Sequence, residues 1–307
     1  MKVLLLGAGG FLGRHIHDHL GRQDDFEVVS APPSRDLDLA GAGPGEWDRL
    51  LDGAAPGAVV NAAGRTSGSP EELWGSNVTL VRGLIGAALR RPAPPRLIHL
   101  GSAAEYGPQE GVVSEETPAR PDAPYGQSKL VGTQALLEAR EQLCVTVLRV
   151  CNPIGAGQGA QTLTGRAALA FRKALERGED EVEFGDLGTA RDFIDARDVA
   201  GAVTTMLRRG PGEALLNVGR GEAVTARTLI SALARVSSYP GRISERASGS
   251  GRSAGLAWQR ADVTRLRRCG WTPVYSLNDA LSALWQGIQT DTPPPSSERQ
   301  LSARGSS

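Results

Sequence analysis

The sequence predicts an α/β fold in which a doubly wound parallel sheet carries a smaller C-terminal domain. Short, continuous apolar runs alternate with longer amphipathic segments through the first half of the chain. Alternation of this kind produces parallel strands joined by right-handed helical crossovers. The length of 307 residues suits one large α/β unit or two unequal domains.

The first half of the chain supplies the predicted sheet. A short, unbroken apolar run is typical of a strand that is covered on both faces, and KVLLL at 2–6 is the first such run. Further strands are predicted at 26–31, 57–64, 96–102 and 144–153. The amphipathic segments between them predict helices at 11–23, 72–91 and 124–143.

After Pro153 the pattern is less regular. Helices are predicted at 164–179, 225–237 and 277–289, a short strand at 215–219, and a strand or turn leading into a helix at 191–210. The Gly/Ser-rich composition of residues 247–255 predicts a loop there. We therefore expect a sheet domain over 1–153 with a contribution from 191–210, a second domain mainly over 154–288, and a disordered tail over 289–307.

Composition excludes several classes of protein. Lys+Arg and Asp+Glu both number 34, so the chain has no field that would attract nucleic acid or an anionic membrane. No apolar run approaches the length of a membrane-spanning helix. Three cysteines are too few for a disulfide framework and favour a reducing, cytoplasmic location. The HIHDH cluster at 15–19 divides its histidines between two helix faces, so we expect no metal site there.

A glycine-rich segment, GAGGFLG, joins the first strand to the first helix. Glycines let the backbone approach a pyrophosphate, and a helix N-terminus favours its negative charge. The spacing is G-x-x-G-x-x-G rather than the commoner G-x-G-x-x-G, and the context still predicts a Rossmann-type dinucleotide site. The residues expected to hold the cofactor here are Gly7, Gly10, Phe11, Leu12 and Gly13.

The end of the second strand bears on which dinucleotide binds. An acidic residue there would favour the free 2′-hydroxyl of NAD, but the segment reads VVSAPPSR. Ser30 and Arg35 instead suit a 2′-phosphate, so NADP(H) is preferred and NAD(H) remains open. Asp38, with Leu39 beside it, is expected to contact the adenine.

Tyr125 and Lys129 form the candidate catalytic pair. They stand four residues apart in YGQSK, so both side chains lie on one face of the predicted helix. A lysine ammonium beside a phenol would lower the pKa of the phenol and prepare it for proton transfer. The alternative is a pair of unrelated surface residues.

Seven segments occur in an order that resembles the extended short-chain dehydrogenase/reductases, the NAD-dependent epimerase/dehydratase family acting on nucleotide sugars. They span nearly the whole chain: GAGGFLG, NAAG, GSAAEYG, YGQSK, RVCNPIGAGQ, RDFIDARDVA and LNVGRGE. The resemblance implies a Rossmann-type domain, a C-terminal substrate domain, a nucleotide-diphosphate sugar as substrate, and a homodimer. It also implies cofactor contacts at Ala62, Ala63, Gly64, Tyr125, Lys129 and Ile154.

The resemblance further assigns roles around the substrate. Ser102, four residues before Tyr106, is expected to hold the reacting oxygen together with Tyr125, the alternative being a serine that only caps a strand end. Ala103 and Tyr106 are expected to line the sugar pocket. Diphosphate contacts are expected from Asn152, Arg191 and Arg252, because amides and guanidinium groups suit phosphate oxygens. We expect Asp192, Asp195 and Asp198 to cap the following helix instead.

The segment GSAAEYG also bears on the reaction. Nucleotide-sugar 4,6-dehydratases carry acids where this chain has Ala103 and Ala104, and methyl groups cannot transfer protons. Glu105 would face the opposite side of an extended segment. A closer likeness, to GDP-4-keto-6-deoxymannose reductases, implies NADPH-dependent reduction of the 4-keto group of a nucleotide-activated 4-keto-6-deoxyhexose. An NAD-dependent 4-epimerase and a non-catalytic dinucleotide-binding protein remain as alternatives.

Overall fold

The computed structural model describes residues 1–246 and 258–290. The predicted Gly/Ser-rich loop, with Arg252, and residues 291–307 of the predicted tail lie outside the described residues. Gln289 and Thr290, which we expected to belong to that tail, still form part of a helix. Within the described ranges, no helix combines the length and apolarity that crossing a bilayer would require.

A six-stranded parallel sheet forms the first lobe and confirms the predicted fold class. Its strands are β1 (Lys2–Leu6), β2 (Glu27–Ser30), β3 (Ala58–Asn61), β4 (Arg96–Ser102), β6 (Val145–Val150) and β11 (Leu215–Val218). They lie in the order β11-β6-β4-β3-β1-β2. The order reverses between β1 and β3, and the crevice at the carboxyl ends of strands beside such a reversal is where doubly wound sheets bind ligands.

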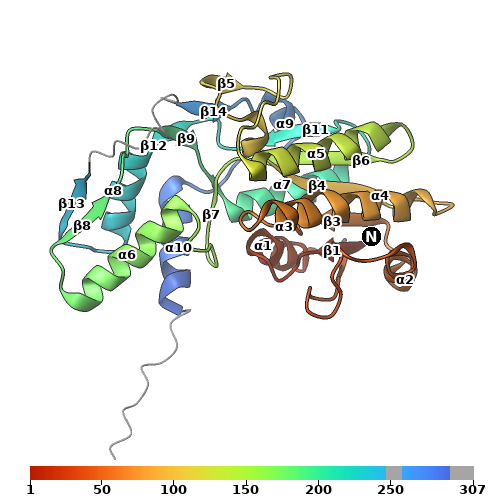
Figure 1. Cartoon of the computed structure of the whole chain (residues 1–307), viewed down its shortest axis with the longest axis horizontal. Helices are drawn as coiled ribbons and strands as arrows, with labels where there is room; N and C mark the ends of the chain where they lie inside the picture. The colour runs from red at the N-terminus through yellow and green to blue at the C-terminus, as the bar shows by residue number, and fades with distance from the viewer. Residues whose placement is uncertain (247–257, 291–307) are drawn as a thin grey trace, which may run out of the picture.

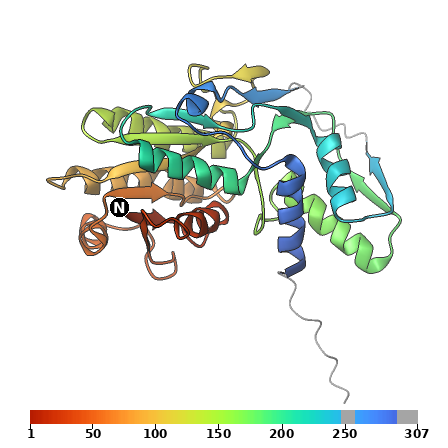
Figure 2. The same ribbon diagram turned by 180° about the vertical axis from the view of Figure 1, so that it is seen from behind.

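Helices cover both faces of this sheet, as the opposite views in Figures 1 and 2 show. One face carries α1 (Phe11–Leu20) and α7 (Ala196–Arg209). The other carries α2 (Pro44–Ala54), α4 (Leu80–Leu89) and α5 (Pro124–Glu138). Doubly wound folds need apolar side chains on both sides of each central strand, which explains the unbroken apolar runs in the sequence.

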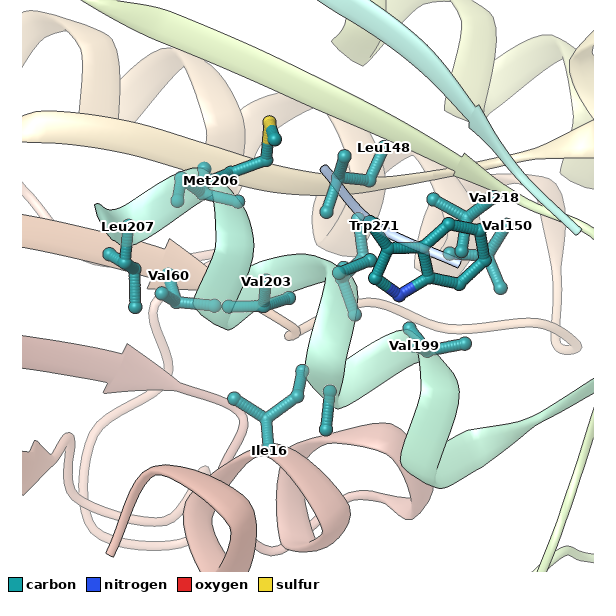
Figure 3. Close-up of a cluster of buried hydrophobic side chains, with 14 of the residues drawn as sticks. Ile16, Val60, Leu148, Val150, Val199, Val203, Met206, Leu207, Val218 and Trp271 are labelled. Atoms are coloured by element: carbon teal, nitrogen blue, oxygen red, sulfur yellow. The ribbon is translucent and has the colours of Figure 1, made fainter. Parts of the chain in front are cut away.

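Strand β1 shows how the sequence divides between the two faces. Val3 and Leu5 belong to the cluster under α1 and α7, whereas Leu4 and Leu6 belong to the cluster on the other face, and all four are wholly buried. The alternation follows from the two-residue period of a strand. Figure 3 shows the first cluster, in which α7 packs between the sheet and Ile16 of α1. Burying one such side chain contributes about 1.5–3 kcal/mol.

The second lobe has its own core around three helices, α6 (Leu163–Arg177), α8 (Ala226–Val236) and α10 (Leu277–Thr290). Among the described residues there are also four two-stranded sheets. They are β5 (Gly111–Val113) with β14 (Gln259–Ala261), β7 (Pro153–Ile154) with β10 (Ile194–Asp195), β8 (Glu181–Phe184) with β13 (Arg242–Glu245), and β9 (Ala190–Asp192) with β12 (Ala223–Thr225).

The chain does not pass from one lobe to the other only once. After α6 and β8 in the second lobe it returns for α7 and β11, and α9 (Thr264–Arg268) also packs on the sheet lobe, where Leu266 is buried. Trp271 follows α9 and fills the space beside α7, as Figure 3 shows. Segments far along the sequence therefore brace the sheet that carries the candidate site.

Several elements differ from the sequence expectations. Helix α2, which begins at Pro44 and buries Trp47 and Leu51, was not predicted. The predicted helix at 72–91 is instead α3 (Pro70–Trp74), a single π-helical stretch η1 (Gly75–Thr79) and α4. The segment after Ser102 is a 3₁₀ turn, η2 (Ala103–Tyr106), rather than extended chain, and a second 3₁₀ turn, η3 (Ala139–Glu141), ends α5.

Candidate active site

The glycine loop at the end of β1 fits a pyrophosphate. Gly10 caps α1 without a side-chain hydrogen bond, and the first turn of α1 holds no acidic residue. Gly7 has a φ of +77°, in the left-handed region that favours glycine. A Cβ on Gly13 would collide with the carbonyl oxygen of Gly7. The backbone is thus packed as closely as a dinucleotide loop requires, and the helix N-terminus offers uncapped N–H groups to an anion.

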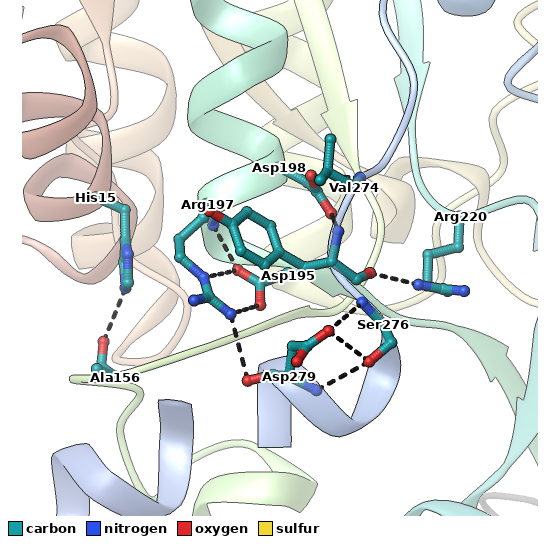
Figure 4. Close-up of polar contacts among 10 residues, drawn as sticks. His15, Ala156, Asp195, Arg197, Asp198, Arg220, Val274, Ser276 and Asp279 are labelled. Carbon is teal, nitrogen blue, oxygen red and sulfur yellow. Dashed lines mark hydrogen bonds and ion pairs between the residues drawn. The ribbon is translucent and has the colours of Figure 1, made fainter. Parts of the chain in front are cut away.

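Beside this loop lie the next two residues predicted for the cofactor. Phe11 lies edge-on to the ring of His15, with 5.5 Å between ring centroids, and Leu12 packs against the core under α1. His15 Nε2 lies 3.0 Å from the carbonyl oxygen of Ala156, as Figure 4 shows. This contact joins α1 to the segment that enters the second lobe. No group of histidine, cysteine or acidic side chains in residues 1–246 and 258–290 is arranged to hold a metal.

The residues predicted to select the dinucleotide follow β2. Ser30 ends that strand and is exposed. The Arg35 side chain is 83 % exposed, and its partner, Asp36, lies 3.7 Å away between Nε and Oδ1. Asp38 Oδ1 accepts the N–H of Ala40 at 3.1 Å. Leu39 packs into the core on the α2 face, so its side chain cannot contact an adenine.

The NAAG segment lies directly against the glycine loop. A Cβ on Gly7 would approach the Ala63 nitrogen to 2.6 Å, so the two turns touch. Asn61 Oδ1 accepts the Ala63 N–H at 3.0 Å and shapes the turn. Ala62 and Ala63 are partly buried, and Gly64 is exposed with a φ of +152°.

The fourth strand ends at Ser102, whose surroundings are fixed by backbone contacts. Its Oγ accepts the Ala104 N–H at 3.2 Å, so the serine does cap the 3₁₀ turn. Its own N–H donates to Glu105 Oε1 at 2.8 Å. The Ser102 side chain also lies close enough to the Tyr125 phenol to lower its pKa. The serine therefore caps the turn and also faces the tyrosine.

Tyr125 lies on the first turn of α5, half-buried. Burial raises the pKa of Tyr125 above its ordinary value, the hydrogen bond with Ser102 acts to lower it, and the charge of Glu105 raises it further. The phenol is accordingly protonated at neutral pH and can donate a proton.

Lys129 does not act on Tyr125 as the sequence suggested. Its Nζ donates to the carbonyl oxygen of Leu100 at 2.5 Å and lies 3.3 Å from His99 Nε2. Burial lowers the pKa of Lys129 to about 8, against the charge of Glu105, which raises it. The predicted lowering of the phenol pKa by an adjacent ammonium was wrong, because the amine is directed into the sheet.

Tyr106 was predicted to line the sugar pocket, and the structure contradicts this. Its side chain has no exposed surface, and its hydroxyl donates to Asn217 Oδ1 at 2.7 Å. The guanidinium of Arg149 stacks 4.6 Å from its ring centroid, and burial raises the pKa of Tyr106 to about 12. Tyr106 thus joins the 3₁₀ turn after β4 to β11 inside the protein.

Glu105 faces away from the substrate side, although not for the predicted reason. The turn is 3₁₀ rather than extended, and it buries the Glu105 carboxylate completely. One oxygen accepts from Ser102 N–H and Thr133 Oγ1, and the other accepts from Arg149 Nε at 2.7 Å. A carboxylate held by these partners is not free to take a proton from a sugar.

Two residues predicted for the diphosphate lie beside each other at the junction of the lobes. Asn152 is exposed, adopts a φ of +27°, and donates from Nδ2 to the Asp192 carbonyl oxygen at 2.7 Å. Arg191 is half-buried, and its guanidinium donates to the Ala190 carbonyl oxygen at 2.8 Å. Burial lowers the pKa of Arg191. Within the described chain Arg191 has no carboxylate partner, so its charge is available to an anionic ligand.

Two further residues, Ala103 and Ile154, were predicted to contact the substrate and the cofactor. Ala103 lies half-buried at the start of the 3₁₀ turn and packs beside Cys151, Ala261 and Val263. Ile154 was predicted to contact the cofactor, but its side chain is wholly buried in the core of the second lobe. That side chain offers no surface to a ligand, so the prediction for Ile154 was wrong.

The three aspartates of RDFIDARDVA have separate roles, of which only one is the predicted cap. Asp195 caps α7 and pairs with Arg197 at 2.7 Å. Asp198 accepts the backbone N–H groups of Val274 and Tyr275 and so holds the segment before α10, as Figure 4 shows. Asp192 accepts three backbone N–H groups, those of Arg220, Gly221 and Ala261, and burial raises its pKa to about 6.

Two polar residues near the site were missed from the sequence. Asn77 lies in the π-helical stretch η1 and is 1 % exposed; its Nδ2 donates to Ser128 Oγ and to the Arg65 carbonyl. Single π turns within helices often occur at functional sites. His99 lies inside the apolar run of β4. A buried polar residue within an apolar pattern was the only signal available for either.

A family model described as the NAD dependent epimerase/dehydratase family matches residues 3–219. The chain belongs to this family. The predicted family is therefore confirmed, and its description is that of NAD-dependent enzymes. The chain is an enzyme of a family that acts on nucleotide sugars.

Individual relatives are named for reactions of nucleotide sugars. A dTDP-6-deoxy-L-talose 4-dehydrogenase (NAD(P)(+)) of Kitasatospora kifunensis is 36 % identical over 94 % of this chain and 96 % of the relative. A GDP-6-deoxy-D-mannose reductase of Pseudomonas aeruginosa is 27 % identical over 92 % of this chain and 95 % of the relative. A solved structure of RMD from Pseudomonas aeruginosa with NADPH superposes with a TM-score of 0.84 at 24 % identity, covering 95 % of this chain and 99 % of that one.

Proposed function

We propose that this chain reduces the 4-keto group of a nucleotide-activated 4-keto-6-deoxyhexose with NADPH. The observation that carries the proposal is that Ser102 and Tyr125 lie next to each other, beside a turn that holds no free acid. The positions where a dehydratase needs its acids hold Ala103 and Ala104, and Glu105 is paired with Arg149 in the interior. Chemistry at one carbon is what these groups can support.

The proposed mechanism assigns each residue one task. The nicotinamide, when bound, supplies hydride to the sugar carbonyl carbon. Tyr125 donates its proton to the developing alkoxide oxygen, and the Ser102 hydroxyl holds that oxygen in place. The raised pKa of Tyr125 keeps its proton in place at neutral pH, as a reductase requires. Asn152 and Arg191 would bind the diphosphate, and Ser30 and Arg35 the 2′-phosphate of the dinucleotide.

The named relatives support this direction of chemistry. Removing hydrogen at C4 of a dTDP-bound 6-deoxyhexose, as the name of the Kitasatospora kifunensis relative describes, is the reverse of reducing a 4-keto group. The Pseudomonas aeruginosa relative is named as a reductase of a GDP-bound 6-deoxyhexose. A dTDP-4-keto-6-deoxyhexose is therefore the first substrate to try, and its GDP counterpart the second.

The test is turnover of NADPH with each 4-keto sugar, followed by its absorbance, in the unaltered chain and in Tyr125→Phe. We expect Tyr125→Phe to lower kcat by about 10²–10⁴-fold while NADPH affinity stays unchanged, because only the proton donor is removed. A variant that keeps most of its turnover would show that another group donates the proton.

A 4-epimerase is the second candidate, because relatives named UDP-glucose 4-epimerase, such as that of Streptomyces lividans at 28 % identity, cover 93 % of this chain. An epimerase returns the hydride to the same sugar and retains its dinucleotide. Dinucleotide extracted from the purified protein distinguishes the two. Stoichiometric NAD that survives purification would favour the epimerase, whereas exchangeable binding with preference for NADPH supports the reductase.

A further inference from the structure

One oxygen of the Glu105 carboxylate connects the two elements that carry the proposed catalytic hydroxyls. Glu105 Oε1 accepts the backbone N–H of Ser102 at 2.8 Å, where β4 ends. The same oxygen accepts the hydroxyl of Thr133 at 3.1 Å, from α5. Thr133 follows Tyr125 on that helix by about two turns. The end of the strand and the helix are therefore joined through a single atom.

The carboxylate is itself held from the neighbouring strand. Glu105 Oε2 accepts from Arg149 Nε at 2.7 Å, and Arg149 lies on β6. Glu105 and Thr133 have no exposed surface, and the Arg149 side chain is 5 % exposed. Because water is kept out, it does not compete for these charge-assisted hydrogen bonds, and the carboxylate keeps one direction.

The space for this carboxylate comes from Gly101, which lies opposite Arg149 in the pairing of β4 with β6. A Cβ on Gly101 would approach Glu105 Oε1 to 2.8 Å. A side chain at this position would therefore push the oxygen away from the Ser102 N–H. The glycine and the glutamate of GSAAEYG thus belong to one arrangement, in which the first leaves the space that the second fills.

The distance between Ser102 and Tyr125 is what this arrangement controls. In the proposed mechanism both side chains must reach one oxygen of the sugar, and a misplacement of about 1 Å can lower a rate by about 10²-fold. The turn after Ser102 also packs directly on α5, because a Cβ on Gly126 would meet the Ala104 carbonyl oxygen at 2.5 Å. A shift of the Glu105 carboxylate would therefore move the serine relative to the helix that carries the tyrosine.

We infer that Glu105 is a positioning residue which sets the distance between Ser102, at the end of β4, and Tyr125, at the start of α5. A carboxylate suits this task because it only accepts hydrogen bonds, and its three partners, Ser102, Thr133 and Arg149, are all donors. The consequence for turnover rests on the proposed function, whereas the connection between strand and helix does not.

Thr133 is the residue to vary, because removing Glu105 would also leave the charge of Arg149 unpaired. Thr133→Val keeps the shape of the side chain without its hydroxyl, whereas Thr133→Ser keeps the hydroxyl. The first measurement needs no substrate: it is the rate at which the Ser102 backbone N–H exchanges with deuterium, followed by nuclear magnetic resonance on the full chain. We expect Thr133→Val to speed this exchange by about three- to tenfold, the effect of one hydrogen bond, and Thr133→Ser to leave it unchanged.

The matched control is Thr204→Val, the same change in a threonine that is 4 % exposed on α7 and donates to the Ala200 carbonyl oxygen at 3.0 Å. Exchange of the Ser102 N–H should not respond to it. An unchanged rate in Thr133→Val, or the same acceleration in all three variants, would show that the Thr133 hydroxyl does not hold the carboxylate and would overturn the inference.

The second measurement is kcat and KM for NADPH-linked turnover of the 4-keto sugar. We expect Thr133→Val to lower kcat by about tenfold with KM unchanged, because Thr133 is wholly buried and can contact neither ligand. Thr133→Ser and Thr204→Val should keep the kcat of the unaltered chain. An unchanged kcat in Thr133→Val would overturn the positioning role. If the unaltered chain reduces no sugar, the proposed function fails, and the exchange rates alone then decide whether Glu105 connects Ser102 to α5.

Discussion

Lys129 shows, at the scale of one residue, how an active site lowers stability. The pKa of Lys129 is about 8 in the folded chain against 10.5 for a free lysine, so the unfolded chain binds more protons between these values. Stability due to this group therefore rises with pH across that window and is lowest at neutral pH. We expect Lys129→Met to raise the free energy of unfolding at pH 7 by roughly 2 kcal/mol, after the lost hydrogen bond to Leu100 is subtracted.

Urea unfolding at pH 7 and pH 10 checks this. The advantage of Lys129→Met should shrink at pH 10, because this pH is close to 10.5, the pKa of lysine in the unfolded chain, so proton binding then favours the unfolded state less. A variant that is less stable than the unaltered chain by the same amount at both pH values would contradict the lowered pKa.

Glu105 gives a second prediction at this scale. Glu105→Gln removes the carboxylate that neutralises Arg149, whose side chain is 5 % exposed. Breaking a buried pair by removing one partner leaves a buried charge and costs about 3–5 kcal/mol. We expect that loss in urea unfolding at pH 7.

The matched control is Glu181→Gln, the same change in the exposed pair with Arg242, whose N–O distance is 2.9 Å against 2.7 Å for the buried pair. Exposed pairs contribute little, so this control should unfold like the unaltered chain. If both variants lost the same stability, the burial of the Glu105–Arg149 pair would not be the cause.

Sequence motifs and their spacing were enough to predict the two residues proposed to contact the substrate. Ser102 and Tyr125 were predicted from their place in GSAAEYG and YGQSK, and the structure brings their hydroxyls together. The prediction that Tyr106 lines the sugar pocket was wrong because its buried position depends on Asn217, a residue more than a hundred positions later. His99 and Asn77 escaped notice because a polar residue inside an apolar pattern shows neither its partners nor its distance from the site.

At the scale of elements, the turn from β1 into α1 carries a prediction with an internal control. Gly13→Ala would place a methyl group on the Gly7 carbonyl, and overpacking of this kind costs about 1–3 kcal/mol. We expect Gly13→Ala to weaken NADPH binding by about 10–100-fold, because the loop must move off its pyrophosphate geometry. Titration of NADPH against protein fluorescence measures this.

Gly9→Ala is the control, because a Cβ at Gly9 would meet nothing within 4 Å. Its NADPH affinity should match that of the unaltered chain. Equal losses in Gly9→Ala and Gly13→Ala would mean that close packing of the loop does not set the affinity.

Strands were easier to predict than the turns that matter to the site. The unbroken apolar runs located β1, β3, β4 and β6 because burial on both faces leaves a local pattern. The π turn at Gly75–Thr79 and the 3₁₀ turn at Ala103–Tyr106 depend on tertiary contacts, those of Asn77 with Ser128 and of Glu105 with Arg149. No local pattern in the sequence contains such contacts.

At the scale of the molecule, topology collects the site from distant segments. The glycine loop follows β1, the NAAG turn follows β3 and Ser102 ends β4, and in this sheet all three strands point the same way side by side. Their carboxyl ends therefore meet at one edge, and α5 supplies Tyr125 there. A linear sequence gives the order of these motifs, but only the strand order of the sheet makes them neighbours.

The thermal stability of the whole molecule can show which dinucleotide it prefers, because a ligand that binds only the folded chain stabilises it by mass action. At a hundred times Kd this amounts to about 2.7 kcal/mol, which a thermal melt detects. If Arg35 binds a 2′-phosphate, its exposed guanidinium should make NADPH raise the Tm more than NADH does at equal concentration. In Arg35→Ala the NADPH shift should fall to the NADH value while the NADH shift stays unchanged. A loss of both shifts would instead indicate damage to the loop, and an unchanged NADPH shift would remove Arg35 from the cofactor site.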